Sequence, residues 1–194
     1  MGIDMRQFLM HCRSQIRIIS MSRRCYSPEA EALIVRIDEE LKKLNTSEAQ
    51  VRPSKVRTFL TMARVLAEQS TCSRRKVGAI FTNEHHHIIA SGYNGNAAGM
   101  DHCIDKPCAG ARLKSGSGLN MCEAIHAEQN ALIQCKDHMA IRVAYLTTSP
   151  CMHCVKMLLN TGCQNIIFID QYTNCEAEKE LWQKSGRKWL HYQI

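Results

Sequence analysis

Two short segments of the sequence carry residue types that bind and use a metal ion. One is His-Ala-Glu at 126–128, and the other is Pro-Cys-Met-His-Cys at 150–154. Residues three apart at the start of a helix share one face, so the thiols of Cys151 and Cys154 can converge with His126 on one ion. Three protein ligands leave the fourth position of a tetrahedral zinc ion to water, as in catalytic rather than structural zinc sites.

Glu128 lies two residues after the histidine and is placed to move protons rather than to bind metal. Bound zinc lowers the pKa of its water towards neutrality, and a neighbouring carboxylate can take that proton. The pattern H-x-E followed by P-C-x-x-C is typical of zinc nucleobase deaminases. The motifs therefore predict attack on C4 of a cytosine ring and loss of ammonia. Zn²⁺ is the predicted cofactor and Glu128 the predicted catalytic residue, with His153 outside the ligand set.

The elements that must hold these motifs alternate between helix and strand. Strands are predicted at 77–82, 88–91, 143–148, 166–169 and 189–194, and helices at 54–67, 124–134, 152–160 and 175–184. This alternation predicts an α/β sandwich. The loop at 100–120 is long for a compact domain, which favours a functional role.

Three successive histidines, at 85–87, fall in the turn between the first two predicted strands. Neighbouring strand residues face opposite ways and turns are exposed. We therefore expect a solvated hairpin tip there rather than a metal site.

Residues 1–53 differ in composition from the rest and are predicted to lie outside the catalytic domain. They comprise a basic leader, an amphipathic helix at 27–45 and a polar linker to Pro53, with the zinc-dependent deaminase domain at 54–194. The leader, which ends near the run Arg-Cys-Tyr-Ser at 24–27, is similar to a mitochondrial transit peptide. We expect a cytoplasmic protein, with mitochondrial import as the alternative.

Composition narrows the class of protein. The 194 residues contain no run of about 18 apolar residues, so no membrane partner is expected. The chain has eleven cysteines, an odd number, and no secretory signal, which indicates thiols and metal ligands rather than disulfides.

The positive charge is concentrated near the N-terminus. Residues 1–57 hold 11 basic and 7 acidic residues, so +4 of the net charge of +7 lies largely outside the predicted domain. The charge is therefore no evidence for nucleic-acid binding, and the aromatic content of 6% is low for stacking on bases.

From about Arg57 onward the sequence resembles the deoxycytidylate (dCMP) deaminases of the cytidine deaminase superfamily. The matching motifs are Lys-Val-Gly-Ala at 76–79, Gly-Tyr-Asn-Gly at 92–95, Ala-Gly at 98–99, His-Cys at 102–103 and His-Ala-Glu-Gln-Asn-Ala-Leu at 126–132. The Gly-Tyr-Asn-Gly turn separates this family from the transfer-RNA adenosine deaminases, which have similar zinc ligands.

The resemblance implies a cytidine-deaminase-like three-layer sandwich, in which a five-stranded mixed sheet has helices on both faces. It implies hydrolysis of dCMP to dUMP, which supplies thymidylate synthesis. It further implies a homo-oligomer, a hexamer, that is activated by dCTP and inhibited by dTTP with Mg²⁺.

The resemblance also assigns substrate contacts. It implies that Asn94 and Gly95 hold the nucleotide phosphate or sugar and that Asn130 meets the sugar. The backbone N–H of Ala127 would bind the base carbonyl, and the backbone carbonyl of Ser149 would face the leaving amine.

Four further cysteines stand at positions similar to those that hold a second, structural zinc in bacterial, archaeal and phage members of the family. They are Cys72, Cys103, Cys108 and Cys122. The resemblance implies a closed four-sulfur site that pins the loop at 100–120. The alternative is four unrelated thiols.

Two residues depart from the family pattern where phosphate is expected. Glu123 replaces a basic residue, and Ser117 replaces a glutamate. Lys76, Arg112 and Lys114 are the candidate phosphate ligands, with solvated surface charges as the alternative interpretation.

Two other functions remain open at this point. One is a zinc deaminase that acts on a base in RNA or DNA, or on another cytosine nucleotide such as dCTP. The other is a zinc-bound interaction module without enzymatic activity. A purely structural zinc site would not need the proton-transferring carboxylate of Glu128.

Overall fold

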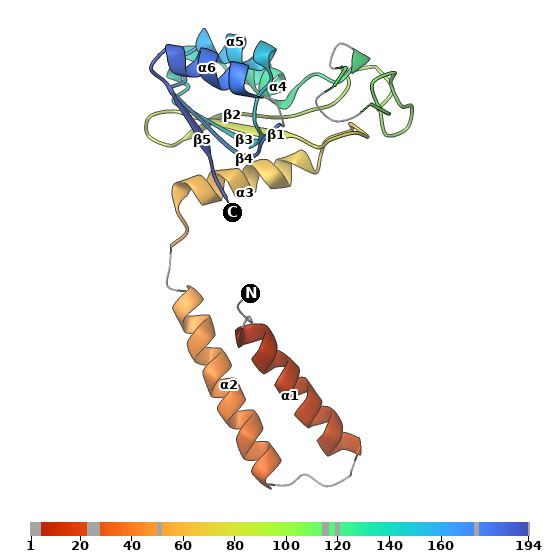
Figure 1. Ribbon diagram of the computed structural model, residues 1–194, viewed down its shortest axis with the longest axis vertical. Coiled ribbons are helices and arrows are strands. Elements are labelled where there is room, and N and C mark those ends of the chain that lie inside the picture. Colours follow the sequence, from red (N-terminus) through yellow and green to blue (C-terminus); the bar gives the residue numbers. More distant parts are fainter. Residues whose placement is uncertain are drawn as a thin grey trace. The chain divides into compact units, whose positions relative to one another are not determined.

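The computed structural model describes residues 5–22, 28–49, 52–113, 117–118, 121–172 and 175–193. The chain divides into two compact units, Met1–Pro53 and Ser54–Ile194, which we describe separately (Figure 1). No helix in these ranges is both long and apolar enough to cross a lipid bilayer.

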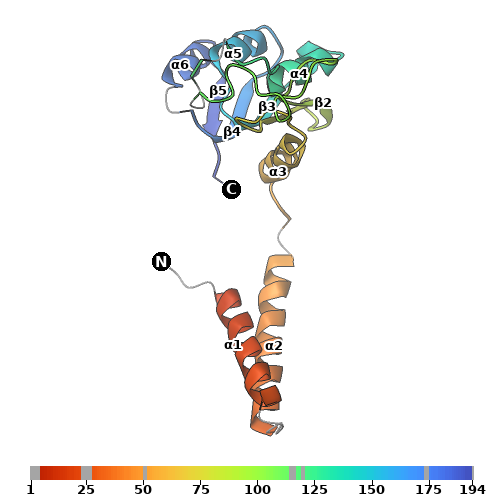
Figure 2. The ribbon, with the colours of Figure 1, turned by 90° about the vertical axis from the view of Figure 1, so that its right-hand side faces the viewer.

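The first unit is a pair of helices, α1 (Met5–Ser22) and α2 (Pro28–Ala49), that pack side by side (Figure 2). The guanidinium of Arg13 pairs with the carboxylate of Asp38, with Nε 2.7 Å from Oδ1. The helix predicted at 27–45 continues to Ala49, so the prediction of a linker from residue 45 was wrong over 45–49. No glycine or proline stands at 45–49 to break the helix, although Asn45, Thr46 and Ser47 are weak helix formers. The end of the basic leader, residues 23–27, lies outside the described residues.

The second unit is built on one five-stranded sheet with the order β2-β1-β3-β4-β5. Its strands are β1 (Gly78–Thr82), β2 (Ile88–Tyr93), β3 (Val143–Thr148), β4 (Asn165–Asp170) and β5 (Lys188–His191). β1 runs antiparallel to both of its neighbours, whereas β3, β4 and β5 are parallel. The predicted mixed sheet is therefore confirmed.

Helices cover both faces of this sheet, which confirms the predicted three layers. Helix α3 (Lys55–Ala67) lies on one face, and the opposite face carries α4 (Ala127–Gln134), α5 (Met152–Leu159) and α6 (Glu176–Lys184) (Figure 1). Alternate strand residues supply two separate cores. Ile80 and Tyr145 pack towards α3, while Phe81 and Phe168 belong to the core on the other face.

Helix α4 begins at Ala127, three residues later than predicted, because the segment before it is extended. Ile125 pairs with Gly95 through two backbone hydrogen bonds, N–H to O, of 2.9 and 3.2 Å. Helix α4 then lies directly on β2 at Gly92, where a Cβ would collide with the Ala127 carbonyl oxygen. A side chain at this strand position would lift the helix that carries the predicted catalytic motif.

Candidate active site

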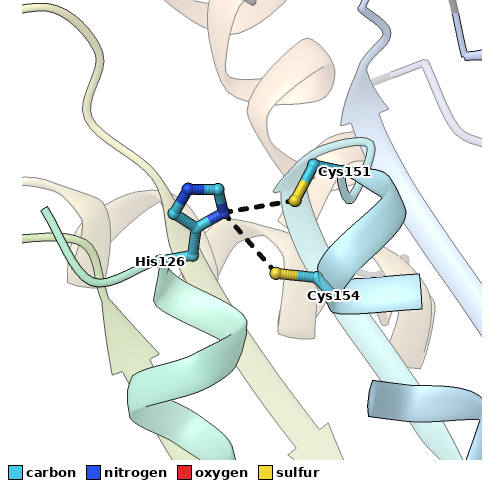
Figure 3. Close-up of side chains that lie close together, drawn as sticks. All are labelled: His126, Cys151 and Cys154. Carbon is cyan, nitrogen blue, oxygen red and sulfur yellow. Dashed lines mark hydrogen bonds between the residues drawn. The ribbon is translucent and has the colours of Figure 1, made fainter. Parts of the chain in front are cut away.

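The first turns of α4 and α5 face one another and bring three metal-binding side chains together (Figure 3). The Nδ1 atom of His126 lies 3.4 Å from the sulfur of Cys151 and 3.5 Å from that of Cys154. The three ligand atoms all lie within 4.8 Å of one another. Within the described ranges, no other group of three or more such donors is this compact.

These distances fit a zinc ion. Zinc–nitrogen and zinc–sulfur bonds of about 2.1 and 2.3 Å at a tetrahedral angle separate the two donors by about 3.6 Å. The observed separations of 3.4 and 3.5 Å match this value. One nitrogen and two sulfurs leave one tetrahedral position for a ligand from outside the chain.

Local hydrogen bonds fix both ends of the site. His126 is the N-cap of α4, and its backbone N–H donates to Oε1 of Gln129 over 2.8 Å. Cys151 is the N-cap of α5 and lies three residues after the end of β3 at Thr148. The backbone N–H of Ser149 donates to the Asp170 carbonyl over 2.8 Å, which ties this turn to the end of β4. His153 is exposed and outside the ligand group.

Hydrogen bonds among the two thiols and the imidazole shift the pKa values of both cysteines. A hydrogen bond from Cys154, and then that from His126, lowers the pKa of Cys151 to about 3. The hydrogen bond with Cys151 raises the pKa of Cys154, and burial raises it further. The lowered pKa favours the thiolate form of Cys151, which is the form of cysteine that binds metal ions.

Glu128 lies one residue into α4 and is only 4% exposed. Burial raises the pKa of its carboxyl group to about 7, although the neighbouring His126 opposes the rise. A carboxyl group that titrates near neutrality can both accept and release a proton at physiological pH.

A cavity of about 510 Å³, which includes the solvent at its mouth, opens onto this cluster. His126, Glu128 and Cys151 line it together with Arg74 and Arg75. The cationic residues in its lining favour an anionic ligand.

The sequence analysis missed the two arginines. Arg74 donates from Nη1 to the carbonyl oxygens of Gly110 (3.1 Å) and Ser117 (3.0 Å), so it is held by the long loop. The guanidinium of Arg75 lies 5.0 Å from the ring centre of Tyr172, which also lines the cavity. The basic run at 74–76 was the available signal, but the sequence analysis chose Lys76, which does not line the cavity.

None of the three predicted phosphate ligands is found in the lining of the cavity, and one of them lies outside the described residues. Lys76 is on the surface and pairs with Glu68, with Nζ 2.7 Å from Oε2. Arg112 is exposed, and neither residue lines the cavity. Lys114 lies outside the described residues.

Asn94 organises the chain around the cavity, whereas Gly95 pairs with Ile125 and is not among the lining residues. Oδ1 of Asn94 accepts hydrogen bonds from the Ser70 hydroxyl and the Val77 backbone N–H, both over 2.7 Å. Its Nδ2 donates to the Arg75 carbonyl over 2.8 Å. Asn94 lines the cavity with most of its polar groups already engaged, so one amide hydrogen remains for another contact.

Of the other residues predicted to contact the substrate, two line the cavity and one does not. Ala127 and Ser149 both line the cavity. Asn130 donates instead from Nδ2 to the Tyr93 carbonyl over 2.7 Å, and it is not among the lining residues. In this structure Asn130 therefore joins α4 to the end of β2.

The second cysteine group is only partly assembled. The sulfurs of Cys103 and Cys108 lie 3.7 Å apart, and Cys72 and Cys122 line the neighbouring cavity. Burial raises the pKa of Cys122, and Cys72 and Cys108 add to the rise. Although all four are described, no three of them form a compact ligand group.

A comparison with known protein families identifies the family to which the chain belongs. Residues 53–170 match the family model of the cytidine and deoxycytidylate deaminase zinc-binding region. The chain belongs to this family.

The chain is also similar in sequence to individual proteins. The chain is 29% identical over 191 residues to deoxycytidylate deaminase of Saccharomyces cerevisiae, which covers 95% of this chain and 59% of the relative. It is 33% identical over 134 residues to ComE operon protein 2 of Bacillus subtilis, which covers 66% of each. The chain thus spans less than two thirds of the length of these relatives.

A solved structure shows the same fold with nucleotides bound. The dCMP deaminase of the cyanophage S-TIM5, in complex with dCMP and dUMP, is similar with a TM-score of 0.56 and 26% sequence identity. The match covers 75% of this chain and 100% of the cyanophage chain.

Proposed function

We propose that the chain is a zinc-dependent hydrolase that converts dCMP and water to dUMP and ammonia, supplying thymidylate synthesis. The observation that carries the proposal is the buried carboxyl group of Glu128, which lines the same cavity as the metal-ligand residues His126 and Cys151 and two arginines. Relatives named deoxycytidylate deaminase support the choice of substrate.

The proposed mechanism assigns a task to each residue. Bound zinc supplies a water of lowered pKa and a positive charge. Glu128 takes one proton from the water and delivers it to N3 of cytosine as the water oxygen bonds to C4. It then takes the second proton from the new hydroxyl group on C4 and delivers it to the amine, so that the C4–N bond breaks, ammonia leaves and the C4 carbonyl of uracil forms. The backbone N–H of Ala127 binds the C2 carbonyl, and the backbone carbonyl of Ser149 orients the amine. Both residues line the cavity, which supports these roles.

We assign the phosphate of the nucleotide to Arg74 and Arg75 in place of the three basic residues predicted from sequence. Guanidinium groups pair well with phosphate oxygens, and both arginines line the cavity that contains Glu128. Asn94 and Gly95 hold this wall in position, and Asn130 is proposed to reach the sugar.

A substrate panel tests the proposal. The zinc-loaded protein is assayed with dCMP, dCTP, deoxycytidine, and single-stranded DNA and RNA oligomers that contain cytosine. We expect the highest kcat/KM for dCMP. Higher activity on an oligomer or on dCTP would replace dCMP as the substrate, and no activity on any cytosine compound would overturn the proposal.

We also propose a second, structural zinc held by Cys72, Cys103, Cys108 and Cys122. The 3.7 Å between two of the sulfurs supports it, because two thiolates on one tetrahedral zinc lie about 3.8 Å apart. Metal analysis should give two zinc ions per chain and one in a Cys108→Ser variant. One zinc ion in both proteins would remove the second site.

The remaining proposals follow from the family. The deaminase domain is assigned to the unit Ser54–Ile194, and the assembly to a hexamer regulated by dCTP and dTTP with Mg²⁺. Sedimentation with and without these nucleotides tests the assembly. A cytoplasmic location is proposed, and N-terminal sequencing of native protein distinguishes it from mitochondrial import with cleavage of the leader.

A further inference from the structure

The tip of the β1–β2 hairpin carries an exposed run of histidines that the active site does not use. Asn83 shapes this tip, because its Oδ1 accepts hydrogen bonds from the backbone N–H groups of His85 (3.0 Å) and His87 (2.9 Å). The backbone N–H of Asn83 in turn donates to the His87 carbonyl over 3.0 Å. The two outer histidines are thus anchored through their backbone, which leaves both imidazoles exposed to ligands.

The turn places the two outer rings close together. The ring centres of His85 and His87 lie 5.9 Å apart, with the ring planes inclined at 44°. His86 between them has a φ of 62°, in the left-handed region that a tight turn requires. The sequence argument that neighbouring residues face opposite ways applies to adjacent positions, but it does not separate residues two apart.

The spacing of these rings suits a shared metal ion. A nitrogen lies about 2.1 Å from such an ion and the ring centre about 1.1 Å further out, so two imidazoles at a tetrahedral angle on one ion have centres about 5.2 Å apart. The observed 5.9 Å is slightly wider, and a rotation of these two exposed side chains closes the difference. Oε1 of Glu84 lies 3.5 Å from Nε2 of His85 and offers a carboxylate beside the same ring.

We propose that His85 and His87 form a separate binding site for a divalent transition-metal ion, with water completing its coordination. Imidazole ligands suit Zn²⁺, Cu²⁺ and Ni²⁺, whereas Mg²⁺ and Ca²⁺ require oxygen-rich sites. The site lies at the turn between Thr82 and Ile88, whereas the active site is reached from the other end of this hairpin, where Gly95 pairs with Ile125. It is therefore independent of the active-site zinc.

Calorimetric titration of the zinc-loaded protein with Ni²⁺ tests the proposal. Ni²⁺ avoids the oxidation of thiols that Cu²⁺ would cause in a chain with 11 cysteines. The test variant is His85→Ala combined with His87→Ala. The matched control is His86→Asn, because asparagine tolerates the left-handed backbone at this position. All three proteins should deaminate dCMP equally, which shows that each is folded.

We expect wild type and His86→Asn to bind one more Ni²⁺ per chain than the double variant. Paramagnetic broadening by the first equivalent should be strongest for resonances of residues 83–88. Equal Ni²⁺ binding by the wild type and the double variant would overturn the proposal. Loss of the additional Ni²⁺ in His86→Asn alone would also overturn it.

Discussion

At the scale of single residues, the proposed chemistry depends on the environment of Glu128. The side chain is 4% exposed, and burial raises its pKa to about 7. A surface glutamate with an ordinary pKa near 4.3 would give up a proton readily but would hold one poorly at pH 7. The position of Glu128, in the lining of the cavity and two residues beyond the metal ligand His126, therefore suits repeated proton transfer.

Replacing Glu128 with glutamine tests this role. Glutamine has nearly the same shape but cannot accept and return the proton, so we expect kcat for dCMP to fall at least about 100-fold. The zinc content should stay unchanged, because the residue is outside the ligand group. Glu68→Gln is the control, since that carboxylate is exposed and pairs with Lys76. Full activity of Glu128→Gln would contradict the proposed mechanism.

A second residue-scale prediction concerns Arg75, whose guanidinium lies over Tyr172 at the cavity. If Arg75 binds the phosphate, Arg75→Gln should raise KM for dCMP about tenfold and leave the activity on deoxycytidine, which lacks phosphate, unchanged. Steady-state kinetics with both substrates measure the difference. Lys76→Gln is the matched control and should behave as wild type. An equal loss on both substrates would show that Arg75 supports the fold of the pocket rather than the phosphate.

At the scale of elements, the sequence predicted most of this architecture because its patterns are local. Each strand of the sheet overlaps a predicted apolar segment, and both metal-ligand motifs fall at the predicted helix starts. The extended segment before α4 was missed because it is fixed by pairing with Gly95, 30 positions earlier in the chain. The same reason explains Arg74, whose position depends on carbonyl groups of a distant loop. Contacts between distant segments leave no periodic pattern in the sequence.

Helix α4 provides the element-scale prediction. A Cβ at Gly92 would collide with the backbone of α4 at Ala127 and Ala131, and a helix backbone cannot yield without moving the whole helix. We expect Gly92→Ala to destabilise the protein by about 1–3 kcal/mol. It should also weaken zinc binding, since His126 caps the displaced helix. Urea unfolding and competition with a chelator measure the two effects.

The neighbouring position supplies the control for this prediction. Ser91→Ala changes an adjacent residue of β2 and should alter neither quantity appreciably. A Gly92→Ala protein with wild-type stability would mean that α4 tolerates the displacement. Unchanged stability with weaker zinc binding would mean that the helix moves without loss of core packing.

At the scale of the whole molecule, the buried thiols connect stability to pH. Cys163 is fully buried in the core between the sheet and the α4–α6 layer, and burial raises its pKa from 9.0 to about 12. The folded protein therefore keeps this thiol neutral at a pH where the unfolded chain ionises it. Its contribution to stability is complete below pH 9 and is lost as the pH rises from 9 towards 12.

We predict that this loss can be isolated by comparing the wild type with Cys163→Ala in urea unfolding from pH 7 to pH 11. Removing the sulfur leaves a cavity, whose cost does not depend on pH, so the variant should be less stable by a constant amount below pH 9. Above pH 9 the gap should close by about 1.4 kcal/mol per pH unit, because only the wild type gains a proton-release site on unfolding. The other buried cysteines, including Cys135 and Cys175, are present in both proteins and cancel in the difference. Parallel curves across this pH range would show that the folded state ionises Cys163 as readily as the unfolded chain, contrary to its position in the core.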